Sequence, residues 1–102
     1  MATGTIKSNH VFIDTSNILH TLSSINEAWT ATADCWACGS MWSTASATAG
    51  VLIDNVDVIF GAGAASVANA AFPVFLPVAK GQVIKTRNAS NTGYAINLYA
   101  MR

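Results

Sequence analysis

The sequence predicts an all-β fold, a sandwich or jelly roll of short strands in one small domain. Apolar and polar residues alternate in several segments, as they do in strands that bury one face. Turn-forming residues, mainly Gly, Asn, Asp and Pro, separate these segments at short intervals. No segment combines the length, end caps and 3.6-residue period of a stable helix. Short strands at regular spacing are typical of sandwiches and jelly rolls.

Each expected strand is an extended run bounded by turn residues. The strands cover residues 5–14, 17–22, 35–42, 50–54, 56–60, 68–78, 82–88 and 94–101. Asp54 and Asn55 are expected to form a two-residue hairpin turn, because Asp and Asn tolerate positive φ. The other breaks are a loop over residues 61–66, a turn at Lys80–Gly81 and a polar loop over residues 89–93.

The composition favours one domain without highly charged partners. The 102 residues suffice for a single small core, and no repeat, linker or internal boundary is visible. The net charge is zero and only 10% of the residues are charged, against about a quarter in soluble domains. Nucleic acid is not an expected partner, because there is no basic stripe. So few charges predict that the chain buries surface against other copies of itself.

A membrane span is not expected, although residues 58–79 carry no charge and are long enough to cross a bilayer. Asn69, Pro73 and Pro77 argue against a membrane helix, and "FPVFLPV" alternates with prolines like an edge strand. The opening "MATGTIKSNH" lacks the apolar stretch of a secretory signal.

The segment "DCWACGSMW", residues 34–42, raises the question of a redox pair or a metal site. A redox pair needs its first sulfur at a helix N-terminus, but Gly39 follows Cys38 and no helical pattern comes next. A zinc site needs four ligands, and only His10 and His20 could join the two thiols, from far upstream. Residues three apart in a strand point to opposite faces. We therefore expect two half-buried thiols that form neither a metal site nor a disulfide.

Catalytic motifs are weak throughout the chain. "VDVIFGAGAAS" resembles a dinucleotide fingerprint, but Pro73 cuts short the helix it needs, and no acidic residue follows Asp57. Asp54 and Asp57 flank a turn, where carboxylates usually face water, and no nucleophile elbow occurs. The sequence therefore predicts a protein that is not an enzyme and needs no cofactor.

The aromatic residues allow two interpretations. Exposed rings in β-proteins often stack on sugars, whereas buried rings fill a core or an interface. The loop over residues 43–49 beside Trp42, and the loop over residues 89–93 before Tyr94, combine small polar residues with a ring. Trp42, Asn91 and Tyr94 are therefore the candidate ligand-binding residues, and the alternative is that both loops are solvated turns.

Four segments occur in an order that resembles the small jelly-roll tip domains of phage tail fibres and needles. They are "EAWTATADCWACGSMW", "GVLIDNVDVIF", "FPVFLPVAKGQVIKTRN" and "GYAINLYAMR". That architecture is similar to tumour-necrosis-factor-like and complement-type globular heads, which form trimers. The resemblance covers residues 26–102 and rests on the order of the segments. Thr32, Cys35 and Asn55 stand where Pro, Gly and Gly are usual, which puts the local turns in doubt.

The resemblance implies a homotrimeric virion tip, made in the bacterial cytoplasm and joined to an upstream fibre or needle shaft. Such a domain attaches to a host-surface component, a glycan or a protein, without catalysis, and a glycan is the leading expectation. Ile96, Leu98 and Tyr99 of the closing strand are the candidates for lining a threefold axis. Residues 1–5 are either a native start or a continuation of the shaft. The alternatives are a trimerisation or capping knob without a ligand, a small lectin unconnected to phage, and, third, an enzyme.

Overall fold

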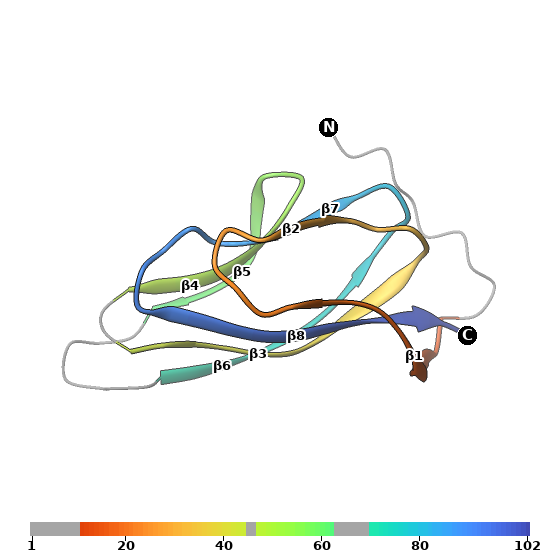
Figure 1. Ribbon diagram of the computed structural model, residues 1–102, viewed down its shortest axis with the longest axis horizontal. Helices are drawn as coiled ribbons and strands as arrows, with labels where there is room; N and C mark the ends of the chain where they lie inside the picture. Colours follow the sequence, from red (N-terminus) through yellow and green to blue (C-terminus); the bar gives the residue numbers. More distant parts are fainter. Residues whose placement is uncertain (1–10, 45–46, 63–69) are drawn as a thin grey trace.

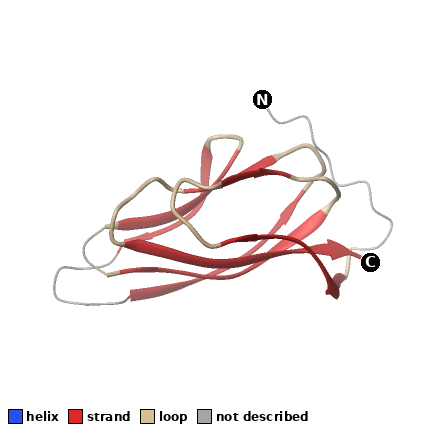
Figure 2. Cartoon of the chain, viewed as in Figure 1, coloured by secondary structure: helices blue, strands red, loops and turns tan. Residues whose placement is uncertain are grey.

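The computed structural model describes residues 11–44, 47–62 and 70–102, and within them all regular structure is β-strand. Eight strands form two four-stranded antiparallel sheets, with strand orders β1-β8-β3-β6 and β2-β7-β4-β5 (Figure 1). The strands are β1 (Ile13–Leu22), β2 (Ala28–Thr30), β3 (Cys35–Ser43), β4 (Thr48–Ile53), β5 (Val56–Ala62), β6 (Ala70–Val78), β7 (Val83–Thr86) and β8 (Thr92–Met101). Turns and loops connect them (Figure 2). The all-β prediction is confirmed, and the arrangement is sandwich-like.

One hydrophobic core is shared by the two sheets. In β8 the buried side chains occupy every second position, from Tyr94 through Ile96 to Leu98. Such alternation places one set of side chains between the sheets and the other set on the outer face. The core contains Leu22, Cys35, Met41, Val51, Val74, Val78, Ile84, Tyr94, Ile96 and Leu98. Full burial of one such leucine contributes about 1.5–3 kcal/mol.

Two buried hydroxyl groups in the core have hydrogen-bond partners. The Tyr94 hydroxyl of β8 accepts a hydrogen bond from the Gly50 backbone N–H of β4 at 2.9 Å, which links the two sheets. The Thr86 hydroxyl donates to the Ser24 carbonyl at 2.6 Å and accepts from the Glu27 N–H at 2.9 Å. Because both hydroxyls are paired, their burial carries no large desolvation penalty.

Two of the predicted turns are confirmed, whereas the predicted loop over residues 89–93 ends earlier because β8 begins at Thr92. Asp54 and Asn55 have φ values of 51° and 66° and connect β4 to β5 as a two-residue hairpin. The Asp54 carboxylate accepts a hydrogen bond from the Val83 N–H at 3.0 Å, which ties this turn to β7. The Lys80–Gly81 turn connects β6 to β7, and Gly81 has a φ of 92° that favours glycine.

Three details differ from the prediction. The strand β1 runs unbroken over residues 13–22, and the expected break appears instead as register shifts against β8 between Ile13 and His20. The strand β2 was not expected, because three residues are too few to show alternation; it exists through pairing with β7, where Trp29 faces Ile84. Residues 61 and 62 continue β5 into the predicted loop. The expected strand at 5–10 and the loop at 63–66 lie outside the described residues.

Over residues 11–44, 47–62 and 70–102 there is no helix long and apolar enough to cross a membrane.

Candidate functional site

Cys35 and Cys38 lie on opposite faces of β3, as predicted. Cys35 is fully buried in the core, and burial, with a smaller contribution from the Asp34 charge, raises the pKa of its thiol to about 11. Cys38 lies on the outer face beside Phe75 and Asn97, and burial raises its thiol pKa too. Both thiols are free and predominantly protonated at neutral pH, which makes them poor nucleophiles. No cluster of three potential metal ligands occurs among the described residues.

The described parts of the two predicted ligand-binding loops lie side by side; residues 45 and 46 are outside the described residues, and Ser43, Thr48 and Thr92 belong to strands. Trp42 faces Gly93 across the β3–β8 pairing, and a Cβ atom added at Gly93 would come within 2.2 Å of the indole ring. The indole therefore lies directly over the Gly93 backbone. The exposed Asn91 adopts a φ of 63°, and its carbonyl accepts hydrogen bonds from the Thr44 N–H at 2.8 Å and hydroxyl at 3.1 Å. Trp42 and Asn91 are thus at the same end of the molecule.

Tyr94 does not join them at the surface. Only 2% of this residue is exposed, and its hydroxyl is bound to Gly50 inside the core. Neighbouring strand positions point to opposite faces, so Gly93 faces Trp42 and Tyr94 faces inward. The expectation that the Tyr94 ring forms a sugar platform is therefore corrected: the ring is a core side chain.

The three candidates for the oligomer interface do not share one face of β8, because side chains alternate between the two faces of a strand. Ile96 and Leu98 have no exposed surface and lie between the two sheets of one protomer. These two side chains are not available to line an axis between chains. Tyr99 lies on the opposite face of β8, where it is half-buried and pairs with Trp36 and Ile18.

The outer side of the sheet β1-β8-β3-β6 is an apolar surface. Trp36 and Phe75 stack with ring centroids 4.9 Å apart and planes at 8°. Phe75 is 64% exposed and Ile18 is 51% exposed. Strand pairing aligns Pro77 and Tyr99 with Trp36 on this side. We call this surface the outer aromatic face; it consists of Ile18, Trp36, Phe75, Pro77 and Tyr99, none of which is charged.

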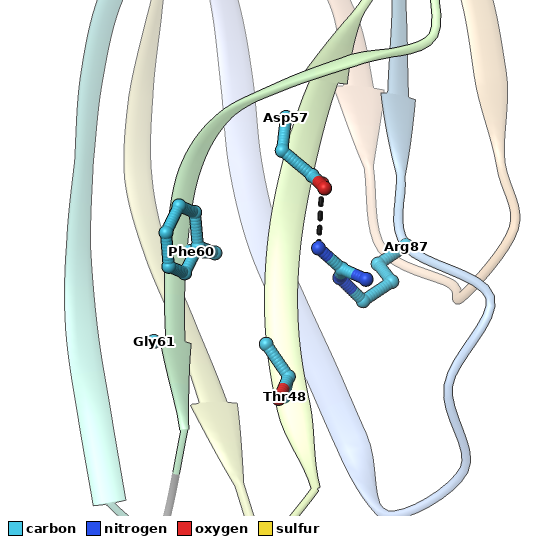
Figure 3. A pocket seen from close by; sticks show the side chains of 5 residues that line it. All are labelled: Thr48, Asp57, Phe60, Gly61 and Arg87. Atoms are coloured by element: carbon cyan, nitrogen blue, oxygen red, sulfur yellow. Dashed lines mark ion pairs between the residues drawn. The ribbon is translucent and has the colours of Figure 1, made fainter.

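A depression of about 480 Å³ occupies the outer side of the other sheet (Figure 3). Thr48 of β4, Asp57, Phe60 and Gly61 of β5, and Arg87 just after β7 line it. These segments meet because β4 pairs with both β5 and β7.

Gly50 of β4 lies between Phe60 and Arg87 and is itself buried. It pairs with Phe60 on one side, and on the other its carbonyl accepts a hydrogen bond from the Arg87 N–H at 2.9 Å. A Cβ atom at Gly50 would lie 2.9 Å from the Arg87 Nε and 3.5 Å from the Phe60 Cβ. The Arg87 side chain therefore packs directly over the Gly50 backbone, and a larger residue at position 50 would displace it.

An ion pair forms one wall of the depression. The Arg87 Nη2 lies 2.6 Å from the Asp57 Oδ1, and the two side chains are 32% and 41% exposed. Partly solvated pairs of this kind contribute at most about 1 kcal/mol to stability. The pair is neutral overall, yet it offers carboxylate acceptors beside guanidinium donors. Phe60, 66% exposed, offers an apolar ring on β5, across β4 from Arg87 (Figure 3).

The residues His20, Glu27 and Trp29 form a separate cluster between β1 and β2. The His20 ring stacks on Trp29 at 5.1 Å, and its Nε2 lies 3.3 Å from the Glu27 carboxylate. The same carboxylate accepts hydrogen bonds from the Ser23 and Ser24 N–H groups at 3.0 and 3.1 Å. This arrangement fixes the loop from β1 to β2, which is a structural role.

The chain matches no known family, and neither a curated protein nor a solved structure is similar to it at a significant level. Fold and surfaces together define an all-β, sandwich-like protein with an uncharged aromatic face on one sheet and a polar-edged depression on the other.

Sequence reasoning missed the residues of the depression. Phe60 and Arg87 are 27 positions apart, and only the pairing of β4 with both neighbouring strands brings them together. The available signal was Phe60 itself, a bulky aromatic residue at an outward strand position followed by the small residues of "GAG".

Proposed function

We propose that this protein is the tip domain of a phage tail fibre or needle, which attaches the virion to a host-surface glycan without catalysis. In this proposal the sandwich is a jelly roll. The strand orders β1-β8-β3-β6 and β2-β7-β4-β5 support it, because successive strands alternate between the sheets for most of the chain. The resemblance of residues 26–102 to such tips gives the setting: the outer end of a tail appendage, joined to a shaft.

The proposal includes a homotrimer that buries the outer aromatic face. Large exposed apolar surfaces are uncommon on monomers and mark interaction sites. Phe75 and Tyr99 lie on this face without any charged side chain between them, which suits an obligate interface. The proposal therefore assigns the trimer contacts to the outer residues of this sheet and no longer to Ile96 and Leu98.

The depression beside Phe60 is the observation that carries the attachment function. An exposed aromatic ring opposite hydrogen-bonding side chains is the arrangement that sugar sites use. The raised thiol pKa values of Cys35 and Cys38 offer no support for a nucleophilic enzyme.

Two measurements on the intact protein test the proposal. Light scattering at micromolar concentration should give three times 10.6 kDa, and a single-chain mass would contradict the trimer. A glycan array should show binding to at least one class of bacterial surface saccharide. A trimer that retains no glycan would contradict the attachment function.

The second candidate function is a capping knob, which closes the end of a fibre and binds no ligand. The outer aromatic face favours it, since that face supports assembly whether or not a ligand binds. A stable trimer with an empty array result is the outcome that distinguishes this function.

A further inference from the structure

We propose that the depression between Phe60 and Arg87 is the ligand site, and that it selects a neutral sugar presenting two adjacent hydroxyl groups. This inference rests on the proposed attachment function and adds the place and the chemistry of the ligand.

The shape of the depression fits a sugar ring. Its volume of about 480 Å³ lies within the range of about 300–1,000 Å³ that is usual for small-molecule sites. Phe60 is 66% exposed, so its ring can stack against the C–H face of a pyranose. Gly50 next to Phe60 allows the Arg87 side chain to lie across β4, because a side chain at position 50 would displace it.

The ion pair supplies the hydroxyl recognition. A carboxylate only accepts hydrogen bonds and a guanidinium only donates them, whereas a hydroxyl group does both. With the Asp57 and Arg87 side chains joined at 2.6 Å, two neighbouring hydroxyls can bind side by side. One hydroxyl donates to Asp57 and the next accepts from Arg87. Thr48 of β4 also lines the depression, and its hydroxyl adds a third hydrogen-bonding group there.

The same pair disfavours acidic sugars. A sugar carboxylate would compete with Asp57 for the guanidinium, and the two negative charges would repel each other. Neutral saccharides keep the ion pair intact. The site is therefore expected to discriminate by charge as well as by shape.

Three variants of the intact protein test this inference on neutral and acidic glycan arrays. Phe60→Ala should weaken binding of the neutral ligand at least tenfold, because the stacking ring is lost. Asp57→Asn should also weaken it at least tenfold and should raise binding of uronic or sialic acids, because Arg87 is freed. Phe12→Ala is the matched control: Phe12 is 73% exposed, away from the depression, and its loss should leave binding unchanged.

The outcomes separate the site from the function. Circular dichroism and thermal melting establish that each variant is folded. If the wild-type protein binds a glycan and the folded Phe60→Ala and Asp57→Asn variants bind it equally well, the proposed site is wrong and the attachment function stands. A wild-type preference for acidic glycans would overturn the neutral-sugar selection. If the wild-type protein binds no glycan, the attachment function and this inference are both wrong.

Discussion

The outer sides of the two sheets differ, although both follow the same alternation of side chains. On β1-β8-β3-β6 the outward rings of Trp36, Phe75 and Tyr99 form an uncharged surface, with the hydrogen-bonded Thr21 and Asn97 beside it. On β2-β7-β4-β5 the outward side carries the Asp57–Arg87 pair and the depression that Phe60 also lines. An apolar, uncharged surface suits contact with another protein, whereas a hollow with paired charges suits water or a small polar ligand.

The two outer faces of one fold can differ without any change in the core. The core residues recur at every second position in both sheets, so each inward position is constrained by packing. Each outward position is free of that constraint. The outer faces can therefore differ in composition while the core stays the same, which is what the proposed division between assembly and binding requires.

Placing a charge on the outer aromatic face should have the largest effect. Phe75→Asp would put an unpaired carboxylate into the proposed apolar interface, which costs several kcal/mol, roughly 3–5 for a buried uncompensated charge. The mass measured by light scattering should fall to that of one 10.6 kDa chain.

Val56→Asp is the matched control for this charge. Val56 is 62% exposed on β5 of the other sheet, and its replacement should leave the mass unchanged. An unchanged mass for Phe75→Asp would show that the outer aromatic face is not the interface.

Substitutions at two neighbouring positions of β8 should have different effects, because one side chain lies in the core and the other on the outer face. Leu98→Ala removes a fully buried side chain and should lower the free energy of unfolding by about 2–5 kcal/mol, measured in urea. Tyr99→Ala changes the outer face and should instead promote dissociation when the protein is diluted. If Leu98→Ala promoted dissociation and Tyr99→Ala lowered the free energy of unfolding, Leu98 would belong to the interface between chains.

Removing the hydroxyl that links the two sheets should have a smaller effect. Tyr94→Phe leaves the Gly50 N–H without its partner, at a cost of about 1–3 kcal/mol. For a domain of this size each kcal/mol lowers Tm by about 4–8 °C, which calorimetry resolves. Glycan binding should be unaffected; a loss of binding without a change in Tm would make Tyr94 a ligand residue after all.

The smallest effect concerns pH and the loop between β1 and β2, which belongs to neither face. The Ser23 N–H lowers the pKa of Glu27 below its usual 4.5, with Ser24 and His20 acting in the same direction and burial opposing them. A lowered folded-state pKa gives stability that is present above about 4.5 and lost as the pH falls through the folded value.

Thermal melting of the wild type and of Glu27→Gln checks this dependence. The wild type should melt higher at pH 6, and the difference should shrink as both samples are acidified. A difference that stays constant with pH would show that the Glu27 charge does not stabilise the loop.

Alternation and turn residues predicted most of the fold. They located β3 through β8 and the hairpin at Asp54 and Asn55, because these features depend on local conformation. Alternation also divides β8 into two sets of side chains. It does not say which set faces the core, and for that reason Tyr94 was expected at the surface.

The depression could not be predicted, because it depends on strand order. Phe60 and Arg87 become neighbours only because β4 lies between them. Only this strand order shows why position 50 requires a residue without a side chain. The strand β2 likewise depends on tertiary pairing with β7, because a segment of three residues is too short to show a strand pattern in the sequence.

The prolines of β6 have a consequence for how the protein behaves when it is concentrated. The strand β6 is the last in its sheet and pairs only with β3 among the described strands. Pro73 and Pro77 have no N–H group to donate, so the open edge presents few donors to an incoming strand. Extension of this sheet by a strand added at β6 is therefore disfavoured. If concentrated samples aggregate through strand pairing, the other edges, β1, β2 and β5, which contain no proline, are the expected points of contact.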